Sequence, residues 1–140
     1  MPKKSLYTAF TDGASSGNPG HSGIGIVIYK DGAELFTESK YIGEGTNNVA
    51  EYSALLHLLK LCELHKIHEI SIFADSELVV KQISGEYKIK NDSLREFATQ
   101  IKEYRKKIKF TLTHIRREQN AVADKLSKIA TKRGENLDNV

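Results

Sequence analysis

The order in which the predicted strands and helices follow one another constrains the fold of this chain more than any other feature. Three segments rich in β-branched and aromatic residues come first, and each predicts a strand: 6–11, 23–29 and 34–42. A tight turn is expected at Asp31 and Gly32, between the second and third strands. The remaining segments predict a helix, a strand, two helices, a strand and a helix: 49–65, 69–74, 76–84, 93–107, 110–115 and 121–132. We therefore expect an α/β fold with a mixed five-stranded sheet, in which three antiparallel strands precede the parallel strands and helices cover both faces.

Short polar residues and glycines predict where the helices begin and end. Ser93 and Asn120 are expected to cap the N-termini of the third and fourth helices, because their side-chain oxygens can accept hydrogen bonds from free backbone N–H groups. Gly85 and Gly134 are expected to end the second and fourth helices.

The composition is typical of a soluble globular protein, since 39% of the 140 residues are hydrophobic and 28% are charged. We expect one domain, 1–134, followed by a polar C-terminal tail, 135–140. No apolar run approaches the roughly 20 residues that a membrane span needs, and no apolar signal core follows the basic N-terminus. Cys62 is the single cysteine, which excludes an intrachain disulfide and fits the cytoplasm, and without a heptad pattern we expect a monomer.

Basic residues gather in two segments, although the formal net charge is only +3. One group lies near the end of the third helix and the other in and before the fourth: Lys102, Arg105, Lys106, Lys107 and Lys109, then Arg116, Arg117, Lys125, Lys128, Lys132 and Arg133. These groups are either solvated helix faces or a surface that faces the phosphates of a nucleic acid.

Two aspartates directly follow predicted strands. Asp12 comes after the first strand and opens a loop expected over 12–20, and Asp75 comes after the strand 69–74. If these strands are neighbours in the sheet, both carboxylates emerge at the same edge. Each aspartate has a simpler alternative as a turn residue, and Asp75 could cap the helix that begins at Ser76.

Glu51 lies on the apolar stripe of the first helix, at helical spacing from Leu55, Leu58 and Cys62. An ionised glutamate that faces a core is costly unless it is paired or bound to a metal. The alternative is a partly exposed acid in the first helical turn, where the helix dipole favours a negative charge.

Asp124 is the acid that periodicity supports least. It falls nearly opposite the apolar stripe of Val122, Leu126 and Ile129, so the pattern alone predicts a solvated residue near a helix N-terminus.

A cluster of three or four carboxylates is held apart by repulsion unless cations neutralise it. Oxygen ligands favour hard ions such as Mg²⁺ or Mn²⁺, and no spacing of His and Cys residues in the chain suggests a zinc site. Two such ions about 4 Å apart would suit phosphodiester chemistry, because they stabilise both the attacking and the leaving oxygen.

Four sequence blocks together resemble the type 1 ribonuclease H family, over roughly residues 5–133. They occur in the family's order at compatible distances: TDGASSGNPG (11–20), TNNVAEYSAL (46–55), ADSELVV (74–80) and REQNAVADKLSKIA (117–130). The resemblance implies an endonuclease that hydrolyses the RNA strand of RNA–DNA hybrids and leaves a 5′-phosphate and a 3′-hydroxyl. Double-stranded RNA is a further possible substrate.

The resemblance also implies roles for individual residues. The catalytic and metal-binding residues would be Asp12, Glu51, Asp75 and Asp124, and they would hold two Mg²⁺ or Mn²⁺ ions. Asp12 would bridge both ions. Asp124 would hold the ion that activates the attacking water, and Glu51 and Asp75 would hold the other ion. The residues that would contact the hybrid are Ser15, Gly17, Asn18, Asn47, Asn48 and Glu77. The simpler alternatives are turn formation for Gly17 and Asn18 and capping of the first helix for Asn47 and Asn48.

The chain departs from the best-known pattern of this family in three places. The segment 115–120 is short and has no histidine, the segment 85–92 has no basic protrusion, and Glu77 stands where glutamine is frequent. These departures predict slower turnover and a modest, salt-dependent affinity for the hybrid. They leave open a catalytically weak or inactive nucleic-acid-binding module. A phosphatase that uses Asp12 as nucleophile would need an aspartate two residues on, where the chain has Ala14.

Overall fold

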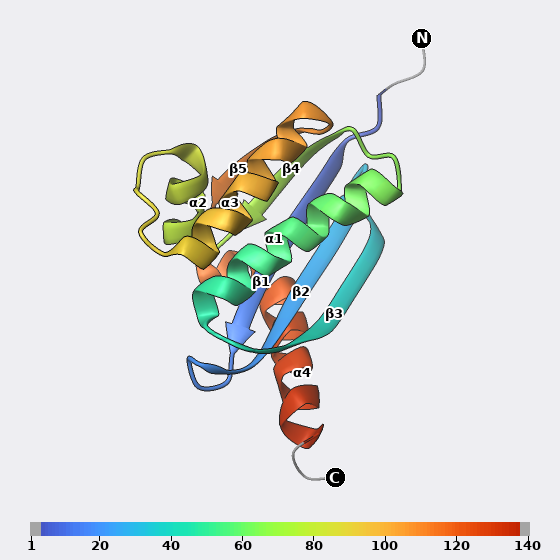
Figure 1. Cartoon of the computed structure of the whole chain (residues 1–140). Helices are drawn as coiled ribbons and strands as arrows, with labels where there is room; N and C mark the ends of the chain where they lie inside the picture. The colour runs from blue at the N-terminus through green and yellow to red at the C-terminus, as the bar shows by residue number, and fades with distance from the viewer. Residues whose placement is uncertain (1–3, 138–140) are drawn as a thin grey trace.

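The computed structural model describes residues 4–137 and contains one five-stranded sheet flanked by four α-helices (Figure 1). The elements in chain order are β1 (Tyr7–Ser15), β2 (Gly20–Lys30), β3 (Ala33–Gly45), α1 (Asn47–Leu64), β4 (Glu69–Ala74), α2 (Glu77–Ser84), α3 (Asp92–Glu103), the short 3₁₀ helix η1 (Tyr104–Lys106), β5 (Lys109–His114), the 3₁₀ helix η2 (Arg117–Gln119) and α4 (Ala121–Leu137). The strand order is β3-β2-β1-β4-β5. β1, β2 and β3 pair antiparallel, and β4 is parallel to both β1 and β5, so the predicted mixed sheet is confirmed.

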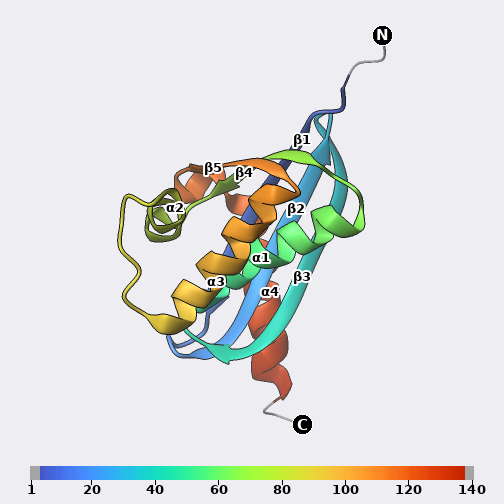
Figure 2. The same cartoon turned by 45° about the horizontal axis from the view of Figure 1, so that its top comes forward.

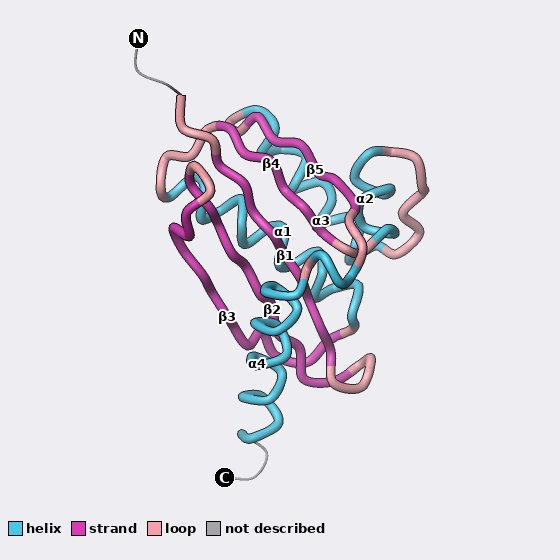
Figure 3. The backbone as a smooth tube through the Cα atoms, turned by 180° about the vertical axis from the view of Figure 1, so that it is seen from behind, coloured by secondary structure: helices cyan, strands magenta, loops and turns pink. Residues whose placement is uncertain are grey.

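Helices cover both faces of the sheet, as the order of the elements predicts. α1 and α3 lie together over one face, and α4 crosses the opposite face (Figures 1 and 2). Seen from behind, α4 runs over β1 and β2 and extends beyond the end of the sheet (Figure 3).

The main core lies between α1 and the sheet. Leu55, Leu58, Leu59 and Cys62 of α1 are at most 1% exposed, which confirms the predicted apolar stripe of this helix. They pack with buried isoleucines of the strands and with α3 in one hydrophobic cluster. This burial of large side chains holds α1 against the sheet.

α4 packs in a different way, and the predicted apolar stripe is wrong for this helix. Val122 is 48% exposed and Ile129 is 38% exposed, whereas the buried residues are mostly small: Ala123, Ser127, Ala130, Thr131 and Gly134. The reason lies in β2, where a Cβ atom at Gly25 would be only 2.1 Å from the carbonyl oxygen of Ala123. The helix approaches the strand so closely that small side chains must face it.

Gly134 does not end α4, which continues to Leu137. This glycine is buried inside the helix, and a Cβ atom there would lie 2.2 Å from the ring of Tyr41 on β3. The residues 135–137 of the predicted tail are therefore helical, and 138–140 lie outside the described residues. The division into a domain and a tail remains a prediction.

The observed N-caps differ from the predicted ones. Thr46 caps α1, accepting a hydrogen bond from the amide of Val49, so neither Asn47 nor Asn48 is the cap. α2 is capped by Ser76 and not by Asp75. In α3 the cap is Asn91, two residues before the predicted Ser93, because the helix already begins at Asp92, and the prediction for Ser93 is wrong.

The prediction for Gly85 is confirmed, since it follows α2 with a φ of 88°. The tight turn between β2 and β3 is also confirmed at Asp31 and Gly32, which both have positive φ. Within residues 4–137, no helix is long and apolar enough to cross a membrane.

Candidate active site

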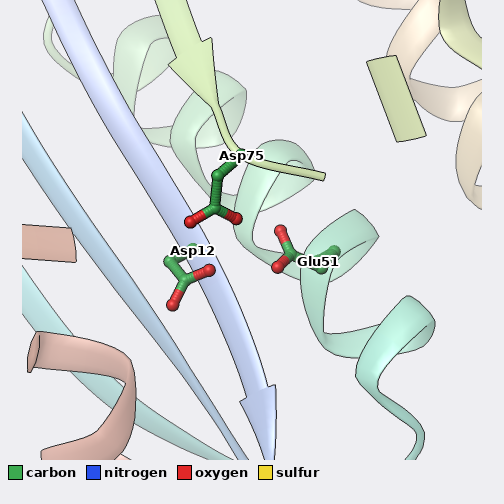
Figure 4. Close-up of side chains that lie close together, drawn as sticks. All are labelled: Asp12, Glu51 and Asp75. Carbon is green, nitrogen blue, oxygen red and sulfur yellow. The ribbon is translucent and has the colours of Figure 1, made fainter. Parts of the chain in front are cut away.

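Three carboxylates from distant parts of the chain meet near the carboxyl ends of the central parallel strands β1 and β4. Asp12 projects from β1, Glu51 from the first turns of α1, and Asp75 from the residue after β4, and their side chains point toward one another (Figure 4). Each offers an oxygen atom, and these three atoms all lie within 4.8 Å of one another. This carboxylate triad could hold a metal ion.

Asp12 lies inside β1, so the prediction that it follows the strand is wrong. The antiparallel pairing of β1 with β2 continues to Ser15, whereas the parallel pairing of β1 with β4 stops at the Thr11–Ala74 pair. β1 therefore runs past the end of β4, and Asp12 is its first residue beyond that pairing. Asp12 and Asp75 still meet, as expected, because both follow the last paired residues of two neighbouring strands.

Gly13 allows Glu51 to reach the triad. A Cβ atom at this position would lie 2.2 Å from the main-chain carbon of Ala50, so any side chain would push α1 away from β1. The amide of Gly13 also donates a hydrogen bond to the carboxylate of Glu51. The glycine thus sets the distance between the helix and the strand that carry the two acids.

Burial and mutual repulsion raise the pKa values of the two inner acids. Asp12 is 4% exposed, and its burial, with smaller contributions from Asp75 and Asp124, raises its pKa to about 6, although Glu51 and Ser127 form hydrogen bonds with it. The pKa of Glu51 is raised well above its ordinary value by burial and then by the charge of Asp12. Without a cation, this pair of carboxyls therefore retains a proton more readily than free carboxyls do.

α4 delivers Asp124 to the same cleft, and the prediction of a solvated residue is wrong. Its side chain is 23% exposed and forms ion pairs through both oxygens: Oδ2 lies 3.0 Å from Nζ of Lys128, and Oδ1 lies 3.7 Å from Nη2 of Arg117. The oxygens of Asp124 do not belong to the 4.8 Å triad.

Asn120 and Ser127 attach α4 to β1 on either side of Asp124. The side-chain amide of Asn120 donates to the carbonyl oxygen of Thr11 at 2.9 Å, and the hydroxyl of Ser127 donates to Oδ2 of Asp12 at 2.7 Å. Asn120 does not cap the helix as predicted, because its side-chain oxygen accepts no hydrogen bond. Its role is to fix the start of the helix beside the triad.

The four predicted acids line one cleft of about 430 Å³. Its other walls are formed by residues 13–15 of β1, by Asn47, Asn48 and Ser76, and by the basic side chains of Arg117 and Lys128. The cleft therefore combines a negative floor with positive groups at one side.

The predicted substrate contacts are divided between the cleft and its surroundings. Ser15, Asn47 and Asn48 line the cleft. Asn47 accepts a hydrogen bond from the amide of Ser15 at 2.8 Å, and its own amide donates to Oδ1 of Asn18 at 3.0 Å, so the β1–β2 turn is tied to the start of α1. Gly17 lies in that turn, outside the cleft lining.

Glu77 also lies outside the cleft lining. It is on the exposed surface of α2, 2.8 Å from Nζ of Lys81, and this lysine lowers the pKa of its carboxyl.

Sequence reasoning missed the parts that Gly13, Ser127 and Lys128 play here. Lys128 lies one helical turn after Asp124, a spacing typical of an ion pair, and that pattern could have identified it. No local pattern distinguishes Gly13 or Ser127, because their contacts come from other elements.

Comparison with known proteins gives consistent matches over most of the chain. The family described as "Reverse transcriptase-like" matches residues 10–130. The chain is 34% identical over 121 residues to "Ribonuclease HI" of Halobacterium salinarum, which covers 85% of the chain and 61% of that protein. The chain thus spans about three fifths of the length of that curated relative.

Two solved structures are similar to the chain over nearly their whole length. One is RNase H1 from Halobacterium salinarum, with a TM-score of 0.87, 33% identity, and coverage of 96% of this chain and 99% of that one. The other is LC11-RNase H1 in complex with an RNA/DNA hybrid, with a TM-score of 0.86, 39% identity, and coverage of 91% and 98%.

Proposed function

Because the chain belongs to the type 1 ribonuclease H family of enzymes, we propose that it is a metal-dependent endonuclease that hydrolyses the RNA strand of RNA–DNA hybrids. The observation that carries this proposal is the carboxylate triad of Asp12, Glu51 and Asp75 at the edge of the sheet. As the resemblance to the family implies, the enzyme would leave a 5′-phosphate and a 3′-hydroxyl.

The residues of the cleft fit Mg²⁺ or Mn²⁺. All of the triad ligands are carboxylate oxygens, which hard divalent cations prefer. A cation would also relieve the repulsion that helps to raise the pKa of Asp12 to about 6. When bound, two such ions would activate a water molecule and stabilise the leaving oxygen of the phosphodiester.

The proposed ligand roles follow from the position of each acid. Asp12 forms hydrogen bonds with Glu51 and Ser127 and is influenced by the charges of Asp75 and Asp124, which supports the proposal that it would help to hold both ions. Glu51 and Asp75 would help Asp12 to hold one ion, and Asp124 would help it to hold the other. Ser127 would orient Asp12 through its hydrogen bond, and Asn120 would keep the start of α4 in place through Thr11.

Recognition of the hybrid would use the polar groups at the mouth of the cleft. Ser15, Asn47 and Asn48 line it, and short polar side chains can contact the ribose 2′-hydroxyl that distinguishes RNA from DNA. Asn18 would support them through its hydrogen bond to the amide of Asn47. We propose that Gly17, Asn18 and Glu77 contact the hybrid from outside the cleft, Gly17 and Asn18 from the β1–β2 turn and Glu77 from α2.

The second candidate is a nucleic-acid-binding module with little or no catalysis. It is favoured by one observation: among the described residues, no histidine lines the cleft. The triad favours the enzyme, since a binding module has no need of three uncompensated acids. A monomeric state, a cytoplasmic location and cleavage of double-stranded RNA remain predictions.

The test is cleavage of an end-labelled RNA–DNA hybrid with Mg²⁺ and with Mn²⁺, comparing the wild type with Asp12→Asn. We expect metal-dependent cleavage of the RNA strand alone, with a 5′-phosphate on the product, and no cleavage by the variant. Binding of the hybrid without cleavage under either metal would favour the binding module. Equal cleavage by the variant would refute the metal assignment.

A further inference from the structure

The four acids of the cleft differ sharply in their counter-charges. Within residues 4–137, no lysine or arginine forms an ion pair with Asp12, Glu51 or Asp75, although all three lie close together. Asp124 has the opposite environment, because both of its carboxylate oxygens face a basic side chain. The cleft therefore has an uncompensated half and a compensated half.

The two basic partners of Asp124 come from different elements. Lys128 lies one turn further along α4, with Nζ 3.0 Å from Oδ2, and Arg117 lies in η2, with Nη2 3.7 Å from Oδ1. Both side chains line the same cleft as the acids. A cation that binds at Asp124 would have to displace these groups or tolerate their positive charge nearby.

We propose that Lys128, assisted by Arg117, acts as a built-in counter-ion that makes Asp124 the weaker of two cation-binding positions. This inference rests on the proposed metal-dependent function and assigns to Lys128 a role in controlling cation loading. The triad attracts the first divalent ion, because it has no positive partner of its own. The position at Asp124 fills in a second, weaker step, after the ammonium group of Lys128 moves away.

The strength of the ion pair sets the size of this effect. Lys128 is 55% exposed and Asp124 is 23% exposed on their side chains, so solvent screens their attraction. We therefore expect removal of the lysine charge to tighten the weaker cation step by about 3–10-fold, and the first step by less.

The experiment is a titration with Mn²⁺ alone, in which calorimetry gives the affinities and electron paramagnetic resonance of the free ion gives the number bound. Lys128→Gln is compared with the wild type and with Lys125→Gln as a matched control. Lys125 is an exposed lysine of the same helix and has no ion-pair partner within residues 4–137. The expected result is a tighter second step in Lys128→Gln and a change of less than about 2-fold in Lys125→Gln.

A double-mutant cycle attributes the effect to the pair itself. In an Asp124→Asn background, Lys128→Gln should have a much smaller effect on Mn²⁺ binding, because the carboxylate that the lysine compensates is absent. Unchanged binding in Lys128→Gln, or an equal change in Lys125→Gln, would overturn the inference while leaving the proposed nuclease intact. Failure of the wild type to bind Mn²⁺ at all would instead refute the metal-dependent function.

Discussion

The helices α1 and α4 lie on opposite faces of the sheet and each brings one acid to the cleft, yet they are held in place by different means. α1 buries large side chains such as Leu55, Leu58 and Leu59, which fill the main core. α4 lies against glycines of β2 through small residues and leaves Val122 and Ile129 exposed. The comparison shows that a helix can be positioned either by burying large side chains in the core or by a close approach of its backbone to a strand.

The two modes of packing have the same result, since each helix brings a side chain into contact with Asp12. Glu51 reaches it because Gly13 lets α1 approach β1, and Ser127 reaches it because α4 lies close to β2. Changes in either helix should therefore alter the cleft, but with different costs in stability.

The largest effects are expected for the acids themselves. Glu51→Gln on α1 and Asp124→Asn on α4 should each lower the cleavage rate at saturating substrate by about a thousandfold, because each would remove a proposed charged metal ligand worth several kcal/mol. Single-turnover cleavage of the hybrid with Mg²⁺ measures this. A much smaller loss in Asp124→Asn than in Glu51→Gln would mean that the two helices do not contribute equally to catalysis.

A smaller effect is expected on stability, and it separates the two packing modes. Leu58→Ala on α1 should lower the free energy of unfolding by about 3 kcal/mol, because it leaves a cavity in the main core. The matched change on α4, Ile129→Ala, should cost less than about 1 kcal/mol, because this side chain is already 38% exposed. Urea unfolding of both variants measures the difference, and equal losses would contradict the packing described for α4.

The charge of Asp12, which both helices contact, should make the free energy of unfolding depend on pH. The raised pKa of Asp12, about 6 against an ordinary 3.8, means that ionisation in the folded state is unfavourable. This destabilisation is absent below pH 4, develops as the pH rises to about 6 and is complete above it. Without metal, Asp12→Asn should therefore be more stable than the wild type at pH 7, by on the order of 2 kcal/mol.

Thermal unfolding at pH 4 and at pH 7, with EDTA and with Mn²⁺, measures the effect. The advantage of Asp12→Asn should vanish at pH 4, where the wild-type carboxyl is protonated, and should shrink when Mn²⁺ stabilises the wild type. An advantage of the same size at both pH values would show that charge repulsion is not its cause.

The smallest effect is expected where the helices begin. Thr46 caps α1 by a hydrogen bond to the amide of Val49, so Thr46→Ala should cost about 1 kcal/mol. Thr46→Ser, which keeps the hydroxyl, is the control and should lie close to the wild type in urea unfolding. If both variants lose the same amount, the cap does not contribute to the stability of α1.

Much of the candidate site could be predicted from the chain alone. Asp12 and Asp75 were expected to meet because both follow neighbouring strands, and Glu51 stood out as an acid on an apolar stripe. These predictions succeed because the order of the elements determines which strand ends are adjacent. Asp124 could not be placed in this way, and only resemblance to the family identified it.

The sequence by itself determined the order of the elements, the pairing of three strands before the parallel ones, the buried face of α1 and the family. These features depend on local periodicity and on the few ways in which such elements can be connected. Tertiary structure alone decided the extent of β1, the face of α4 that is buried and the pairing of Asp124 with Arg117. The physical reason is that close backbone approaches, such as α4 against Gly25, depend on contacts between segments far apart in the chain, which no local pattern encodes.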